Sequence, residues 1–283
     1  MTSAAASIPS IPLNDGHSIP QIGLGTWPLN DAELADAIVT AAPLGYRHID
    51  SAMRYGNEEG VGEGIRRTGI PREEFFVTTK LDGEFQGEDR AIAGLADSLQ
   101  RMEFSYVDLL LIHWPKPWED QYVSTWKTFE HLKSEGLVRS IGVSNFKPEH
   151  LDRLAAETGT VPAVNQIQLN PNVVRLAQRT YHEAHGIVTE SYSPFGGGGS
   201  ALFSDPVLTR IGKAYGKTAA QVCLRWLTQQ DIVVIPRTSR IERLSENFAI
   251  FDFELAAAEM KEIAGLAHDG RRIVDWSWSP KWD

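Results

Sequence analysis

The sequence predicts an α/β fold, a (β/α)8 TIM barrel preceded by a β-hairpin. Short apolar runs rich in β-branched residues recur along the chain, helical patterns separate them, and 283 residues suffice for one barrel. Most runs are continuously apolar, as in strands buried on both faces of a parallel sheet. A doubly wound open sheet is the alternative, because periodicity does not distinguish open from closed sheets. The eight expected strands are residues 21–26, 46–49, 75–79, 107–113, 138–143, 164–169, 187–192 and 232–236.

The segments between these runs carry helix start signals. Asn30 and Glu33 form a capping box ahead of an apolar helical pattern. Pro148 stands at a first helical position, and Thr218 caps an expected helix over residues 219–230. Strand-like runs therefore alternate with helices along the chain, as a barrel requires.

The two ends of the chain are expected to cover the two ends of the barrel. Residues 11–13 and 18–20 flank Asn14-Asp15-Gly16, a strong hairpin signal, and we expect this hairpin to close the bottom of the barrel. Residues 1–10 are expected to form a frayed tail. Residues 271–283 are polar and contain three tryptophans, which predicts a loop over the active face. Without an evident linker or repeat, residues 1–283 are interpreted as a single domain.

Composition and charge disfavour several classes of function. The net charge of −10 argues against a nucleic-acid partner, since an acidic surface repels phosphate backbones. The single cysteine, Cys223, excludes a disulfide framework and is interpreted as a core thiol. No segment approaches the ~18 apolar residues of a membrane span, and the N-terminus lacks the features of a signal peptide. We therefore expect a cytoplasmic, monomeric enzyme with no membrane partner.

Side chains capable of hydrogen bonding stand at or near the carboxyl end of every expected strand, where barrel enzymes place their active sites. Taken singly, Lys80 could be a rim charge, His113 a core imidazole and Asp50 a turn cap. Together the strand ends predict an active site, because burying polar groups costs several kcal/mol unless they are paired. The residues are Thr26, Trp27, Asp50, Lys80, His113, Ser144, Asn145, Gln166, Tyr192, Ser193, Arg237 and Thr238, with Tyr55 in the loop after Asp50.

Asp50, Tyr55, Lys80 and His113 form a combination that suits general acid catalysis. A phenol has a reference pKa of ~10, and a neighbouring ammonium lowers it by stabilising the phenolate. We expect Lys80 to lower the pKa of Tyr55 and Asp50 to keep Lys80 protonated. His113 would orient a carbonyl toward the Tyr55 hydroxyl. Since no side chain here is an obvious nucleophile, hydride from a bound nicotinamide is the natural attacking group.

Seven stretches carry long motifs in a fixed order. They are GYRHIDSAMRYGNEEGVG (45–62), TTK (78–80), LLLIHWP (109–115), IGVSNF (141–146), PAVNQIQLNP (162–171), SYSPFG (191–196) and IPRTSRIERLSEN (235–247). With these motifs the chain resembles an aldo-keto reductase over nearly its whole length, and most resembles the bacterial 2,5-diketo-D-gluconate reductases. The resemblance implies a catalytic tetrad of Asp50, Tyr55, Lys80 and His113, and His113 implies reduction of C=O bonds.

The resemblance also implies a site for NADPH/NADP+. Ser144, Asn145 and Gln166 would bind the nicotinamide carboxamide, and Tyr192 would stack on the ring. Three guanidinium groups suit the 2′-phosphate, which favours NADPH over NADH. One of them, Arg237, replaces the family's usual Lys. The other implied cofactor residues are Thr26, Trp27, Asp50, Ser193, Phe195, Gly196, Thr238, Arg240, Arg243, Glu246 and Asn247.

The implied substrate is a small carbonyl compound, such as an aldehyde, a keto sugar or a diketo sugar. Tryptophans in loops over the active face are better explained as an apolar collar around the carbonyl than as core residues. The implied pocket residues are Trp27, Tyr55, His113, Trp114, Trp118, Trp276 and Trp278.

Three alternative functions fit the sequence less well. A Schiff-base aldolase would use Lys80 as nucleophile, but it needs a neutral amine, and Asp50 favours the ammonium. A reductase-like barrel retained as a binding subunit lacks an evident docking face. A metal site is disfavoured because the remaining histidines have no ligand spacing and are expected to face solvent; they are His17, His131, His150, His182, His185 and His268.

Overall fold

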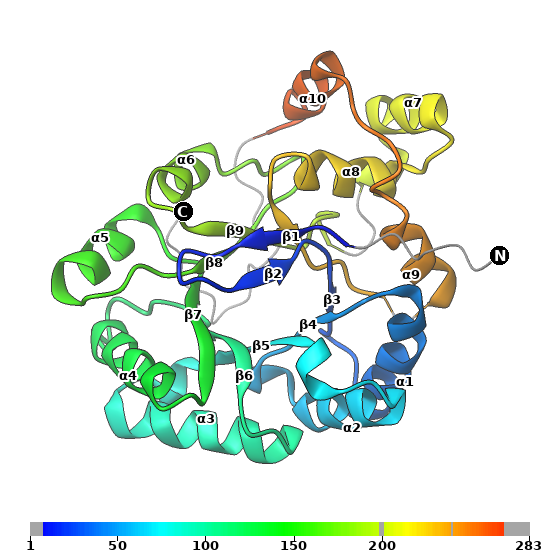
Figure 1. Cartoon of the computed structure of the whole chain (residues 1–283). Coiled ribbons are helices and arrows are strands. Elements are labelled where there is room, and N and C mark those ends of the chain that lie inside the picture. Colours follow the sequence, from blue (N-terminus) through cyan, green and yellow to red (C-terminus); the bar gives the residue numbers. More distant parts are fainter. Residues whose placement is uncertain (1–7, 198–200, 239, 269–283) are drawn as a thin grey trace.

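Eight parallel strands close into a barrel (Figure 1). The computed structural model describes residues 8–197, 201–238 and 240–268. Parallel bridges from Ile22 to Val234 and from Gly25 to Arg237 join the first strand to the last, so the sheet is closed and the open-sheet alternative is wrong. The strands are β3 (Gly23–Gly25), β4 (His48–Asp50), β5 (Phe76–Leu81), β6 (Val107–Ile112), β7 (Val138–Ser144), β8 (Val164–Gln168), β9 (Val188–Tyr192) and β10 (Val233–Val234).

Helices surround the barrel, and their apolar faces pack on the strands (Figure 1). The predicted capping box is confirmed, because the Asn30 side chain accepts from the Glu33 N–H and the Glu33 carboxylate from the Asn30 N–H, both at 3.0 Å. Thr218 caps its helix as predicted, and Cys223 is a buried thiol. The helices are α1 (Asp31–Ala41), α2 (Glu58–Thr68), α3 (Glu88–Met102), α4 (Tyr122–Ser134), α5 (Pro148–Glu157), α6 (Leu176–Ala184), α7 (Pro206–Tyr215), α8 (Ala219–Thr228), α9 (Ile241–Phe248) and α10 (Ala257–Ala264).

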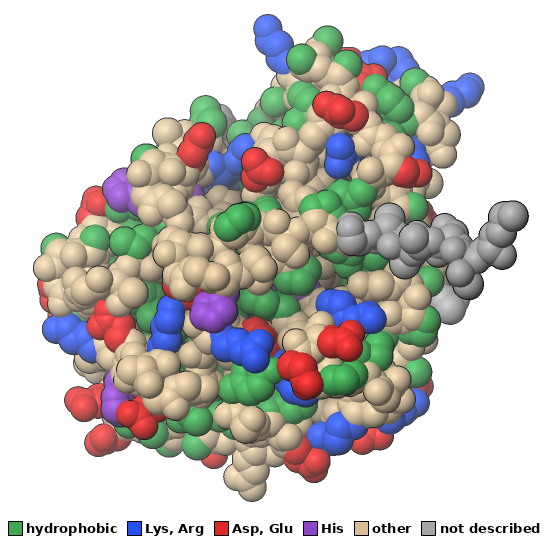
Figure 2. Space-filling model, viewed as in Figure 1, with side chains coloured by type: hydrophobic (Ala, Val, Ile, Leu, Met, Phe, Trp, Pro, Cys, Tyr) green, Lys and Arg blue, Asp and Glu red, His purple; other side chains and the backbone are tan. Residues whose placement is uncertain are grey.

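The predicted hairpin is present and closes the amino-terminal end of the barrel. It consists of β1 (Ser10–Pro12) and β2 (Ser18–Pro20), and Figure 1 shows it crossing the ring of strands. Leu13 and Ile19 pack against apolar side chains inside the barrel, including Phe76 and Val164, which lie where their strands begin. On this face, acidic and basic side chains are interspersed (Figure 2).

The chain ends differ in part from expectation. Ser10 pairs with Pro20, and the Pro9 carbonyl accepts from the Gln21 N–H at 2.8 Å, so residues 8–10 belong to the fold and not to a frayed tail. The expected loop over residues 271–283, with Trp276 and Trp278, lies outside the described residues. Within the described ranges, no helix combines the length and apolar character needed to cross a membrane.

Two histidines expected to face solvent are buried. His182 of α6 contacts the Asn165 side chain through Nε2 at 2.8 Å and the Thr189 hydroxyl through Nδ1 at 2.9 Å. Burial lowers its pKa to about 4, so the ring is neutral. His150 Nδ1 accepts from the Lys147 N–H at 3.1 Å. Both expectations fail because these imidazoles serve as hydrogen-bonding groups on the inner faces of their helices.

Because Ile19 is fully buried in the barrel floor, we expect Ile19→Ala to leave a cavity and to lower the free energy of unfolding by about 2–5 kcal/mol. Urea unfolding measures this change. Ile92→Ala, on the exposed face of α3, is the control and is expected to change stability by no more than about 0.5 kcal/mol. Equal effects of the two substitutions would contradict the role of the hairpin as a plug.

Candidate active site at the carboxyl ends of the strands

The strands bring the four candidate catalytic side chains to one end of the barrel. Asp50 is the last residue of β4, Lys80 lies near the end of β5, and His113 directly follows β6. Tyr55 lies in a 3-10 turn, Met53–Tyr55, in the loop after β4. Because all the strands are parallel, these ends open on the face opposite the hairpin.

A buried ion pair between Lys80 and Asp50 forms the centre of this group. The Lys80 Nζ donates to the Asp50 Oδ1 at 2.6 Å and to the Ser51 carbonyl oxygen at 2.9 Å. Burial opposes the charge of Lys80, but its acidic neighbours, first among them Asp50, outweigh burial and raise the pKa of Lys80. Burial also raises the pKa of Asp50, which the Lys80 contact opposes. At 2.6 Å the geometry favours the ammonium–carboxylate form.

The Tyr55 ring lies beside this charge. The Lys80 Nζ is 5.1 Å from the centroid of the Tyr55 ring. Burial raises the pKa of Tyr55, and Lys80 offsets only part of that increase. The prediction that Lys80 lowers the pKa of Tyr55 below its ordinary value is therefore wrong for the resting protein, because desolvation of the hydroxyl dominates. Tyr55 is protonated at neutral pH, the form that a proton donor requires.

His113 faces Tyr55 from the end of β6. The centroids of the two rings are 5.8 Å apart, in an edge-on arrangement. Burial, reinforced by the positive charges of Lys80 and Arg54, lowers the pKa of His113 well below its usual value. Among the described residues, none bonds to its buried Nδ1. The imidazole is therefore neutral at neutral pH and has one N–H to donate.

Polar side chains at the ends of β7 and β9 extend the site beyond His113. The Asn145 Nδ2 donates to the His113 carbonyl oxygen at 3.2 Å and to the Ser144 Oγ at 3.0 Å. The Tyr192 hydroxyl donates to the Asn145 Oδ1 at 2.9 Å. Asn145 itself has a left-handed backbone, with φ of 63°. Such strained conformations persist where surrounding bonds hold them, and they cluster at functional sites.

Gln166 of β8 connects these polar side chains to the ion pair. Its backbone carbonyl oxygen accepts from the Ser144 Oγ at 2.9 Å, and its side-chain Nε2 donates to the Asp50 Oδ2 at 2.7 Å. Ser144, Asn145, Gln166 and Tyr192, all assigned to the cofactor by resemblance, therefore lie in one hydrogen-bonded network with Asp50.

The loop after β9 holds the next group of cofactor candidates. Ser193 and Gly196 both have positive φ, 50° and 78°, and the Gly196 N–H donates to the Ser193 carbonyl oxygen at 2.9 Å. Phe195 packs against Phe203, with ring centroids 5.4 Å apart. Turns of this kind can form anion-binding concavities from their backbone N–H groups, which suits a phosphate of the cofactor that the resemblance implies.

The expected phosphate-binding arginines follow β10. Arg237 bridges to Gly25, which places its backbone beside the end of β3, and Arg237, Arg240 and Arg243 are all exposed. Thr238 is buried, and its Oγ1 accepts from the Arg240 N–H at 3.1 Å. Of the other implied cofactor residues in this segment, Glu246 accepts from the Thr218 hydroxyl, and Asn247 is buried.

Aromatic side chains line one side of the opening at the carboxyl ends of the strands. The half-exposed Trp27 ring lies 5.4 Å from that of Tyr55, and the Trp114 ring stacks at 6.5 Å from that of His113. Trp118 is 61% exposed in the loop after β6. Beneath Trp27, the buried Thr26 hydroxyl donates to the Ser51 Oγ at 3.2 Å.

Sequence reasoning missed two buried polar groups, Glu190 and His48. Glu190 lies in the middle of β9, where its Oε2 accepts from the Gln166 Nε2 at 2.9 Å. The His48 Nε2 of β4 lies 3.6 Å from the Glu190 Oε1. The available signal is a charged residue inside an expected buried strand, away from the strand ends where polar side chains are expected.

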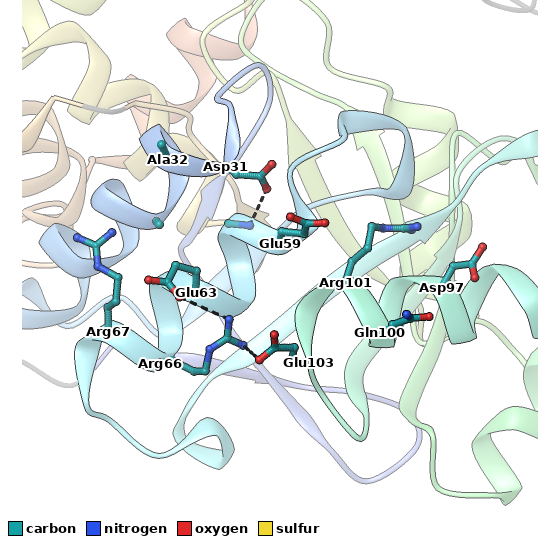
Figure 3. Close-up of a pocket in the computed structure, with 12 residues that line it drawn as sticks. Asp31, Ala32, Glu59, Glu63, Arg66, Arg67, Asp97, Gln100, Arg101 and Glu103 are labelled. Atoms are coloured by element: carbon teal, nitrogen blue, oxygen red, sulfur yellow. Dashed lines mark hydrogen bonds and ion pairs between the residues drawn. The ribbon is translucent and has the colours of Figure 1, made fainter.

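A charged hollow elsewhere on the surface is separate from this site. Figure 3 shows it between α1, α2 and α3, on the outside of the barrel. Arg66 pairs there with Glu63 at 3.6 Å and with Glu103 at 3.0 Å. The Arg66 charge is thus satisfied within this hollow, and the strand ends remain the candidate site.

The comparisons with known proteins agree with the barrel and its strand-end site. Residues 21–268 match the Aldo/keto reductase family. An aldo-keto reductase of Mycolicibacterium smegmatis is 48% identical, over 94% of this chain and 95% of that protein. The methylglyoxal reductase DkgA of Escherichia coli is 43% identical, over 93% of this chain and 94% of that protein.

Solved structures support the same assignment. The crystal structure of a Gox0644 mutant in complex with NADPH is 43% identical and superposes with a TM-score of 0.90, covering 94% of this chain and 96% of that one. The family match extends over most of the chain, and the relatives are similar over nearly their whole length. The chain therefore belongs to the aldo/keto reductase family of oxidoreductases.

Proposed function

We propose that this enzyme is an NADPH-dependent carbonyl reductase in which Tyr55 protonates the carbonyl oxygen. The observation that carries the proposal is the buried Lys80 ammonium, 2.6 Å from Asp50 and 5.1 Å from the centroid of the Tyr55 ring. A neutral His113 lies edge-on to that ring, with the two ring centroids 5.8 Å apart. An acid, a charge that stabilises its conjugate base, and a neutral hydrogen-bond donor are thus grouped around one point.

The residues present fit an NADPH cofactor. Amide and hydroxyl groups at the ends of β7, β8 and β9 suit a carboxamide, and the positive-φ turn at Ser193 and Gly196 suits a pyrophosphate. The exposed guanidinium groups of Arg237, Arg240 and Arg243 suit a 2′-phosphate. When bound, the reduced nicotinamide supplies the hydride that the protein's own side chains do not provide.

The proton of the reaction is supplied by the protein's own residues. Tyr55 gives its hydroxyl proton to the carbonyl oxygen as the carbonyl carbon receives hydride, so a C=O bond becomes an alcohol. Burial keeps Tyr55 protonated before the reaction and destabilises its phenolate. The Lys80 ammonium is therefore needed beside the oxygen on which the negative charge develops. Asp50 holds that ammonium in place, and the single N–H of the neutral His113 ring donates to the carbonyl oxygen of the substrate and orients it.

The substrate class proposed is small aldehydes and keto or diketo sugars. Trp27 and Trp114 provide an apolar wall beside Tyr55, and DkgA, a methylglyoxal reductase by name, is a relative at 43% identity. Trp118 is the remaining described candidate for this wall. The enzyme proposed is a monomer, in which the four catalytic groups need no residue from a partner subunit. The raised pKa of Lys80 argues against a Schiff-base aldolase, which needs a neutral amine.

The proposal is tested with NADPH and a panel of small aldehydes, keto sugars and diketo sugars, by following the loss of nicotinamide absorbance. We expect Tyr55→Phe to lower kcat by roughly 10²–10⁴-fold, because it removes the general acid. NADPH binding, measured by protein fluorescence, should persist. Absence of turnover by the unaltered protein across the panel would contradict the function, and a Tyr55→Phe variant with most of its rate would contradict the acid assignment.

The cofactor preference is tested at the arginines after β10. We expect Arg240→Ala or Arg243→Ala to raise the KM for NADPH by at least about tenfold, since a charge-assisted bond to a phosphate is lost. The KM for NADH, which lacks the 2′-phosphate, should stay unchanged. Arg210→Ala is the matched control, because Arg210 is an exposed arginine of α7 paired with Glu262. Equal loss with NADPH and NADH would contradict a 2′-phosphate contact.

A further inference from the structure

A carboxyl group that the proposed mechanism does not use lies next to the catalytic ion pair. Glu190 is fully buried inside the barrel, on β9. Its Oε2 accepts from the Gln166 Nε2 at 2.9 Å, and its Oε1 lies 3.6 Å from the His48 Nε2. Among the described residues, none makes a hydrogen bond with that Oε1. A buried acid in the middle of a strand is costly, so its retention calls for a role.

The first consequence of this placement concerns the Gln166 amide. Its Nε2 donates to the Asp50 Oδ2 at 2.7 Å and to the Glu190 Oε2 at 2.9 Å. A primary amide has two N–H donors, and the two carboxyl groups take both. Rotating the amide by half a turn would direct its oxygen at these acceptors instead. Asp50 and Glu190 together therefore fix which way the amide oxygen of Gln166 points.

The second consequence concerns charge. Asp50 and Glu190 share one cation, Lys80, in a site without solvent. Burial, together with the negative charge of Asp50, raises the pKa of Glu190 to about 8. His48, on the other side, has its pKa lowered to about 3 by burial and by Lys80, so it supplies no second cation. At neutral pH, one carboxylate and one neutral acid thus accompany Lys80.

We propose that Glu190, in its neutral form, is a positioning residue for carbonyl reduction: it orients the Gln166 amide toward the cofactor and leaves Asp50 as the single carboxylate that opposes Lys80. The inference rests on the proposed function. Ionised Glu190 adds negative charge near Tyr55 and raises its pKa further. Proton donation by Tyr55 therefore weakens once Glu190 ionises, and the titratable groups around Glu190 are Asp50, Lys80, Tyr55 and His48.

Two substitutions separate the orienting role from the charge. Glu190→Gln keeps an acceptor oxygen for Gln166 but cannot ionise, whereas Glu190→Leu has a similar volume and no acceptor. Thr189→Val is the matched control, since it removes a buried hydrogen bond, to His182, from the neighbouring position of β9. Urea unfolding of all three variants shows how much stability each change removes.

Cofactor binding is the readout that does not depend on turnover. We expect Glu190→Leu to raise the Kd for NADPH by about tenfold, the loss of one hydrogen bond. Glu190→Gln and Thr189→Val should bind NADPH as the unaltered protein does. Binding of 2′,5′-ADP, which has no nicotinamide, should be the same in all four proteins. Unchanged NADPH binding by Glu190→Leu, or equal loss with 2′,5′-ADP, would overturn the orienting role.

The pH profile of kcat tests the charge. In the unaltered enzyme, kcat for reduction should fall as the pH rises through about 8, where Glu190 ionises. In Glu190→Gln this fall should be absent; an unchanged fall would overturn the charge role. Should Glu190→Leu not fold, Glu190→Gln still decides this point. Absence of any turnover by the unaltered enzyme would contradict the proposed function itself, while the binding titrations would still test Glu190.

Discussion

A single ammonium group inside the barrel determines the arrangement of the active site. Lys80 projects from β5 into an interior without solvent, where an uncompensated charge is highly unfavourable. Asp50 and the Ser51 carbonyl oxygen, both at the end of β4, satisfy it at 2.6 Å and 2.9 Å. Adjacent parallel strands bring these groups together without a contribution from flexible loops. The ion pair is therefore a property of the barrel itself.

The same burial sets the protonation states around Lys80. Desolvation raises the pKa of Tyr55 and lowers the pKa of His113, so both are neutral in the resting protein. A tyrosine that is a weak acid at rest needs the cation only when the phenolate forms. In the proposed mechanism, stabilisation by Lys80 is thus concentrated in the transition state, where it would accelerate the reaction.

Sequence patterns predicted the barrel and the groups at its strand ends because both follow from local rules. Continuous apolar runs indicated parallel strands, and parallel strands place their carboxyl ends on one face. Asp50, Lys80 and His113 could therefore be grouped without coordinates. Resemblance to a family added the expected cofactor roles of Asn145 and Gln166, which their place at the strand ends does not reveal.

Several features depended on three-dimensional surroundings and were not predictable in this way. The pKa of Tyr55 is set by the balance of burial and nearby charge, and the extent of burial can be read only from the structure. His182 and Glu190 lie at positions whose inward orientation depends on packing and register. Trp276 and Trp278 lie outside the described residues, so their expected place in the substrate pocket stays a prediction.

The most direct measurement is the coupling free energy between Lys80 and Asp50 in a double-mutant cycle, obtained by urea unfolding. Lys80→Met and Asp50→Asn should each lower the free energy of unfolding by about 3–5 kcal/mol, since each leaves a buried charge unpaired. The double variant should lose much less than the sum. Additive effects, within about 0.5 kcal/mol, would contradict a buried ion pair as the basis of this site.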